Sequence, residues 1–181
     1  MNKIQNTKLT FAIGFIVLAA ISRFIPHTPN FTPIMAMSIF GGLLFADKKY
    51  AFIVPILAMI FTDAIIGFHN TIAFVYGAFI IGVVLGFFLK SGLKLSRLAV
   101  VSLSGSVIFF ILTNFGAWLM SGLYPLTFEG LMQAYFFGLP FFSYSPLEMF
   151  GFTLLGDLFF NFLFFFVISL SYKYIPKYIL S

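Results

Sequence analysis

The feature that most constrains this chain is a series of long apolar runs that carry almost no charge. Most of these runs are long enough to cross, as helices, a hydrocarbon core about 30 Å thick. Charged residues make up only 8% of the 181 residues, against roughly 25% in a soluble domain. This composition excludes an ordinary soluble protein, and we expect an all-α integral membrane protein.

Proline and capping residues between the apolar runs divide the chain into six expected transmembrane helices. A Thr-Pro pair at 32–33 and a Ser-Pro pair at 145–146 each place a capping hydroxyl ahead of a proline at the first helical position. Glu148 completes a capping box with the second pair, and Asn70 is expected to cap the fourth helix. The second run is short, so we expect its neighbours to bury part of it. The expected spans are 9–25, 33–46, 50–68, 71–89, 98–121 and 146–172.

These spans form a compact bundle, and we expect residues 1–181 to be a single transmembrane domain. A cleavable signal peptide is the alternative for residues 1–25. Its small-x-small triplet, Ala20-Ile21-Ser22, matches a cleavage site only weakly, so this run is interpreted as the first helix. The small residues Ala78, Gly82 and Gly86 predict close packing of the fourth helix against another helix of the bundle.

Basic residues fall in alternate connections between the spans. Nine of the ten lie at the N-terminus, in the second and fourth connections, or after the last span. By the positive-inside rule this face is cytoplasmic, which places both termini inside. We therefore expect a multi-pass protein of the bacterial cytoplasmic (inner) membrane, whose partners include the lipid bilayer and no nucleic acid. The nine residues are Lys3, Lys8, Lys48, Lys49, Lys90, Lys94, Arg97, Lys173 and Lys177.

The connection between the fifth and sixth spans, residues 122–145, is the longest on the outer side. Within it, Thr127 can cap a short helix near 128–137 that is rich in apolar and aromatic side chains. Such a segment lies in the membrane interface or folds over the bundle. We expect a short interfacial helix here.

Ionisable side chains inside the spans are the clearest functional signal, because each costs about 2.5–3.5 kcal/mol to place in hydrocarbon. Asp63 and Asp157 are the two cases, and Asp157 shares one helical face with Asn161, four residues later. Most other unusual polar side chains fall in the outer half of the membrane or the outer loops. This asymmetry predicts a substrate pocket that opens to the outside. The candidate substrate-binding residues are Arg23, His27, Asn30, Asp63, His69, Tyr76, Asn114, Trp118, Asp157 and Asn161.

Two interpretations of these residues stay open. Arg23 can pair with Asp63 or Asp157 and lock helices together, as buried membrane charges often do. Alternatively, these groups bind a ligand. The two histidines lie in loops, where a histidine is more often solvated than a metal ligand.

The sequence contains no catalytic constellation. It has no Walker A, HExxH or GxSxG motif and no cysteine. We therefore expect no enzymatic activity, no catalytic residues, no metal site and no cofactor.

Several segments resemble an uncharacterised bacterial family of membrane transport proteins, itself similar to the S components of energy-coupling factor (ECF) transporters. The resemblance covers roughly residues 9–170. It implies a six-helix protein that captures a small, vitamin-like substrate from outside for uptake, with an energising transporter module as a partner. The alternative is a structural or assembly subunit of the inner membrane with no transported substrate. The segments are RFIPHTPNFTPIMAMSIFGG (23–42), TNFGAW (113–118), Tyr124-Pro125, LPFF (139–142) and Gly156-Asp157.

Overall fold

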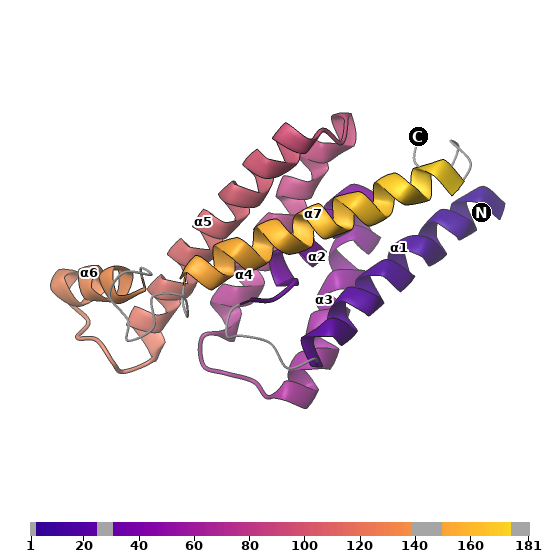
Figure 1. Cartoon of the computed structure of the whole chain (residues 1–181). Coiled ribbons are helices and arrows are strands. Elements are labelled where there is room, and N and C mark those ends of the chain that lie inside the picture. The colour runs from indigo at the N-terminus through magenta and orange to yellow at the C-terminus, as the bar shows by residue number, and fades with distance from the viewer. Residues whose placement is uncertain (1–2, 25–30, 139–149, 175–181) are drawn as a thin grey trace.

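The computed structural model describes residues 3–24, 31–138 and 150–174, and these residues are helical, with no strand (Figure 1). The expected all-α class is therefore confirmed for the described residues. The α-helices are α1 (Lys3–Ile21), α2 (Ile34–Leu44), α3 (Lys48–Ile66), α4 (Ile72–Phe87), α5 (Leu95–Met120), α6 (Phe128–Phe137) and α7 (Phe150–Tyr174); the 3-10 helices are η1 (Ser22–Phe24) and η2 (Phe88–Ser91).

Three helical segments are long and apolar enough to cross a membrane: Lys48–Ile66, Ile72–Ser91 and Leu95–Met120. Three shorter apolar stretches accompany them: Leu9–Phe24, Ile34–Leu44 and Leu154–Leu170. Large apolar side chains also face outward, including Leu57 and Phe61 on α3, which are 58% and 65% exposed. Contiguous exposed apolar surface of this kind marks a membrane or protein interface. The fold is therefore that of a membrane protein.

Helix α2 lies at the centre of the bundle. Every residue from Met35 to Gly42 is buried, and the helix packs against α1, α3, α4, α5 and α7. The Phe40 ring packs against those of Phe15 on α1 and Phe164 on α7, at centroid distances of 6.1 and 5.5 Å, and these two rings also touch each other at 4.5 Å. The prediction that neighbours bury the short second run is confirmed.

The backbones of α2 and α4 approach so closely that their facing glycines have no room for a side chain. A Cβ atom on Gly86 would collide with the carbonyl oxygen of Ile39, and one on Gly42 with that of Val83. Gly82 faces α2 in the same way, so the predicted small-residue packing of the fourth helix is confirmed. Because higher residue numbers on α2 meet higher numbers on α4, the two helices run parallel.

Two expected helix caps are wrong. Pro33, rather than Thr32, occupies the N-cap of α2, since its carbonyl accepts the first helical hydrogen bond, from the Met37 N–H at 2.7 Å. Proline has no side-chain oxygen, so this helix has no side-chain cap. Thr71, rather than Asn70, precedes α4, since the turn from His69 to Ile72 delays the helix. Both helices therefore begin one residue later than expected.

Other helix ends follow clearer local signals. Asp47 caps α3 by accepting a hydrogen bond from the Lys49 N–H at 2.8 Å, so this helix begins at Lys48 rather than at residue 50. Gly92, with φ of 141°, ends η2 and lets α5 begin at Leu95 rather than at 98. The predicted cap of α6 is confirmed, because Thr127 accepts from the Gly130 N–H at 3.2 Å. The capping box expected at 145–148 lies outside the described residues.

The contact of α2 with α4 predicts a sharp contrast between two glycines of α4. Gly86→Ala should lower the free energy of unfolding by about 1–3 kcal/mol, the usual cost of overpacking, because the methyl group meets the Ile39 carbonyl. Gly77→Ala should be tolerated, since nothing lies within 4 Å of its added Cβ. Thermal unfolding in detergent micelles measures both, and equal midpoints for the two variants would contradict the packing.

Candidate functional site

A cavity of about 290 Å³ opens at the end of the bundle where η1, the end of α3 and the start of α4 meet. Its volume lies at the small end of the range for small-molecule sites, about 300–1,000 Å³. Polar and apolar side chains both contribute to its wall. The lining residues are Arg23, Thr32, Ile34, Met35, Asp63, His69, Thr71, Val75, Phe109, Phe110, Thr113, Asn114, Gly138 and Asp157.

The cavity brings together side chains that are far apart in the sequence. Tyr76 and Asn161 do not line it, but they hydrogen-bond the two aspartates that do. The residues of the predicted site that line the cavity are Arg23, Asp63, His69, Asn114 and Asp157.

Trp118, another expected site residue, is not in the cavity wall. Trp118 lies on α5 beyond the cavity, where its indole N–H donates to the Pro125 carbonyl at 2.9 Å. His27 and Asn30 lie outside the described residues.

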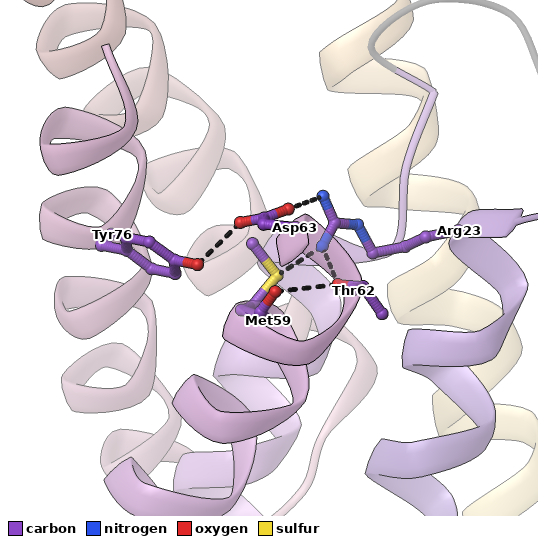
Figure 2. A network of polar contacts seen from close by, with 5 residues as sticks. All are labelled: Arg23, Met59, Thr62, Asp63 and Tyr76. Carbon is purple, nitrogen blue, oxygen red and sulfur yellow. Dashed lines mark hydrogen bonds and ion pairs between the residues drawn. The ribbon is translucent and has the colours of Figure 1, made fainter. Parts of the chain in front are cut away.

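One wall of the cavity is a paired ionic network (Figure 2). Arg23 Nη2 lies 2.6 Å from one carboxylate oxygen of Asp63, and the Tyr76 hydroxyl donates to the other at 2.7 Å. The second guanidinium nitrogen donates to Thr62 and contacts the Met59 sulfur at 3.4 Å. The network joins η1, α3 and α4, and the Arg23 and Asp63 side chains are only 10% and 6% exposed. Of the two partners that the sequence allowed for Arg23, Asp63 and Asp157, the structure shows Asp63.

Asp157 also lines the cavity, and no basic side chain among the described residues pairs with it. Its Oδ2 accepts from the Ser106 hydroxyl at 2.6 Å. One turn further, the Asn161 amide donates to the Ser102 hydroxyl at 3.0 Å and to the Asp157 carbonyl at 2.7 Å. Residues 157 and 161 face residues 106 and 102, so α5 and α7 run antiparallel.

Sequence reasoning missed Ser102 and Ser106. Both are buried, and their spacing of four residues within an apolar run places them on one helical face. That spacing is the same signal that identified Asp157 and Asn161. Serine can hydrogen-bond the carbonyl of the preceding helical turn, as Ser106 does with Ser102 at 3.1 Å. A serine within a span therefore needs no partner from another helix, and it is a weaker functional signal than an aspartate.

The cavity wall also includes the Asn114 amide and the rings of Phe109 and Phe110. Asn114 donates to the Phe110 carbonyl of its own helix at 2.8 Å. Gly138, at the end of α6, packs on the Asn114 amide so closely that a Cβ atom there would collide with its oxygen. His69 lies at an exposed position and hydrogen-bonds Thr71 at 2.9 Å.

This arrangement can bind a small molecule through hydrogen bonds and ring contacts. Among the described residues, no three histidine, aspartate or glutamate side chains gather in a way that could hold a metal ion. The cavity chemistry is set by one satisfied ion pair, one further carboxylate, an amide and several hydroxyls beside Phe109 and Phe110.

The ion pair makes a prediction for stability. Arg23→Met should lower the free energy of unfolding by about 3–5 kcal/mol, because it leaves the Asp63 carboxylate buried without a counter-charge. The double variant with Asp63→Leu should recover most of this loss, since both charges are removed together. Chemical unfolding in micelles measures both, with Arg97→Met as a matched control that disturbs only contacts with Ser91 and Gly92. A double variant no more stable than the single one would contradict the pairing.

Comparison with known proteins gives one result. Residues 3–178 match the model of a family described as a family of unknown function (DUF6580). No curated protein and no solved structure matches the chain. Because the family match extends over nearly the whole sequence, the chain belongs to DUF6580.

Proposed function

We propose that this protein is a membrane transport protein, similar to ECF S components, that binds a small vitamin-like molecule from outside for uptake. The observation that carries the proposal is the cavity of about 290 Å³, in which polar side chains from several helices converge beside two phenylalanine rings. Polar groups that converge on a hollow with apolar and aromatic side chains in its wall are typical of small-molecule sites. An energising module outside this chain is the proposed partner.

The chemistry of the wall narrows the substrate class. The Arg23 guanidinium is already committed to Asp63, Thr62 and Met59, whereas the Asp157 carboxyl has no basic partner among the described residues. The wall therefore favours a neutral or positively charged molecule over an anion. Phe109 and Phe110 provide rings for an apolar or aromatic part of such a molecule.

The proposal includes six membrane spans with both termini in the cytoplasm. Parallel α2 and α4 and antiparallel α5 and α7 are the directions that alternating spans require. The start of α1 and the end of α7 lie at the same end of the bundle (Figure 1), as an even number of spans demands.

Charge distribution supports the orientation. The cavity borders the start of α2 and α4, whereas the basic residues gather at their other end. There Lys90 donates to the Phe45 carbonyl at 2.6 Å, and its ammonium lies 4.9 Å from the Phe87 ring centre. By the positive-inside rule, that end faces the cytoplasm and the cavity faces outward.

Helix α6 is proposed to lie in the outer interface. In Figure 1 it lies at one end of the bundle, and it packs against α5, where the Tyr135 hydroxyl donates to the Ile111 carbonyl at 3.1 Å. Its exposed Phe128 and Met132 suit lipid, while hydrogen bonds from its own backbone and from Thr127 lower the pKa of Glu129 and keep that carboxylate charged. An amphipathic segment of this kind is stable between hydrocarbon and water.

A structural or assembly subunit is the second candidate. The observation that favours it is the ionic network of Arg23, Asp63 and Tyr76, which satisfies its own charges and joins three elements without a ligand. In that case the cavity would hold no specific small molecule.

The orientation predicts where reporter domains will be found. Fusions after Lys94 and after residue 177 should report the cytoplasm, and one inserted in 122–127 should report the outside, because nine basic residues lie on one face and one on the other. Paired phosphatase and fluorescent-protein reporters measure this. An external reporter at residue 177 would contradict the six-span arrangement.

The cavity predicts retention of a small molecule. Protein purified from native membranes should carry an enriched compound by mass spectrometry. Asn114→Ala should reduce the retained amount about tenfold or more, because the ligand loses a hydrogen bond that is costly to leave unmade, about 1–3 kcal/mol.

Gln133→Ala is the matched control, since this amide lies on α6 outside the cavity. It should leave retention unchanged. Folded protein that carries no enriched compound in any preparation would favour the structural subunit instead.

A further inference from the structure

We propose that Asp157, Ser106, Ser102 and Asn161 form a binding site for a monovalent metal cation, with Na⁺ as the fitting ion. These four side chains lie between α5 and α7, and all four residues are buried. Asp157 also lines the cavity, whereas the other three do not. The site therefore lies beside the substrate cavity and shares one residue with it.

The ligand chemistry suits a hard cation. The side chains offer a carboxylate, two hydroxyl oxygens and an amide oxygen, with no sulfur or imidazole among them. Oxygen ligands of this kind select alkali and alkaline-earth ions. Because one carboxylate supplies a single negative charge, a monovalent ion makes the site neutral, whereas a divalent ion would leave buried positive charge.

A charged Asp157 carboxylate at this buried position requires a positively charged partner. Its side chain is 3% exposed, and the ion pair of the described residues joins Arg23 to Asp63 instead. Among the described residues, the Ser106 hydroxyl is its side-chain donor, at 2.6 Å. A single neutral donor compensates poorly for the water that a buried carboxylate gives up, and intramembrane charges are normally paired.

An independent observation comes from Asn161, which is 1% exposed. Its Oδ1 has no hydrogen-bond partner among the described residues. Turning the amide over does not help, because the Asp157 carbonyl at 2.7 Å can only accept and so requires the NH₂ group on that side. The amide oxygen is thus a buried acceptor that lacks a positive or donor group, which a cation supplies.

The Ser106 hydroxyl points to the same ion. It lies within hydrogen-bond distance of two acceptors, Asp157 Oδ2 at 2.6 Å and the Ser102 carbonyl at 3.1 Å, yet it has one proton. With a cation present, the Ser106 hydroxyl can donate its proton to the Ser102 carbonyl. Its lone pair and the Asp157 carboxylate then face the ion. Ser106 can then act as a ligand, because its hydrogen bond to the Ser102 carbonyl replaces the one to Asp157.

The position suggests a role in uptake. A cation at Asp157 neutralises the cavity wall, so ion binding and substrate binding affect one another through a shared carboxylate. This role rests on the proposed function. The ion site itself does not, because it is complete without a substrate.

The test uses the purified full-length protein in detergent without added substrate. Its thermal midpoint should rise saturably with NaCl at constant ionic strength, made up with choline chloride, and ²²Na⁺ binding should reach one ion per chain. Linkage requires that an ion binding only the folded state stabilise it. KCl in place of NaCl distinguishes Na⁺ from a general alkali cation, and either ion acting saturably supports the site.

Variants assign the response to these residues. Asp157→Asn should fold and lose the Na⁺-dependent rise, and Asn161→Ala and Ser102→Ala should each weaken apparent Na⁺ affinity about tenfold. Ser104→Ala, on the same helix, is the matched control and should respond like the unmodified protein. If Asp157→Asn does not fold, the Na⁺ affinities of Asn161→Ala and Ser102→Ala test the site instead.

Two results would overturn the site. One is a midpoint that changes with pH but not with Na⁺ or K⁺ at any pH, which would mean that Asp157 carries a proton. The other is an unchanged Na⁺ response in Asn161→Ala and Ser102→Ala. Neither bears on ligand retention, so failure of the ion site and failure of the proposed transport function are distinguishable.

Discussion

The close contact of α2 with α4 is the interaction on which the rest of the structure depends. At Gly42 and Gly86 the two backbones meet without intervening side chains, which brings the short α2 into the centre of the bundle. In lipid, where no hydrophobic effect drives helices together, such backbone proximity is a main source of association. It also fixes the start of α2, so that Ile34 and Met35 line the cavity instead of facing lipid.

The two buried aspartates show different solutions to one electrostatic problem. Asp63 is compensated inside the protein by Arg23 and Tyr76, which makes it part of the framework. Among the described residues, the Asp157 carboxyl accepts from the Ser106 hydroxyl, and the amide oxygen of Asn161, one turn further along α7, has no partner. An ionisable group that the fold leaves uncompensated at membrane depth is the better functional candidate, because a structural role would favour full pairing.

This difference shapes the proposed transport function. The committed Arg23 removes the positive charge that an anionic substrate would need. The Asp157 carboxyl, which has no basic partner among the described residues, is proposed to bind a cation, a positively charged substrate group or both. A cavity in which one carboxylate is paired and another has no counter-charge among the described residues can couple an ion to a neutral substrate. A purely structural subunit has no evident need for the second carboxylate.

The sequence by itself determined the helical class, the alternation of basic connections, the apolar faces and the identity of the intramembrane aspartates, because these follow from hydrocarbon length and the cost of burying charge. The cap of α6 by Thr127 is similarly local. Only the tertiary structure decided that Arg23 pairs with Asp63, that Ser102 and Ser106 face Asn161 and Asp157, and that Trp118 lies away from the cavity. These outcomes depend on which helices become neighbours and in what register, and that is fixed by backbone contacts such as Gly42 with Gly86, which no local pattern specifies.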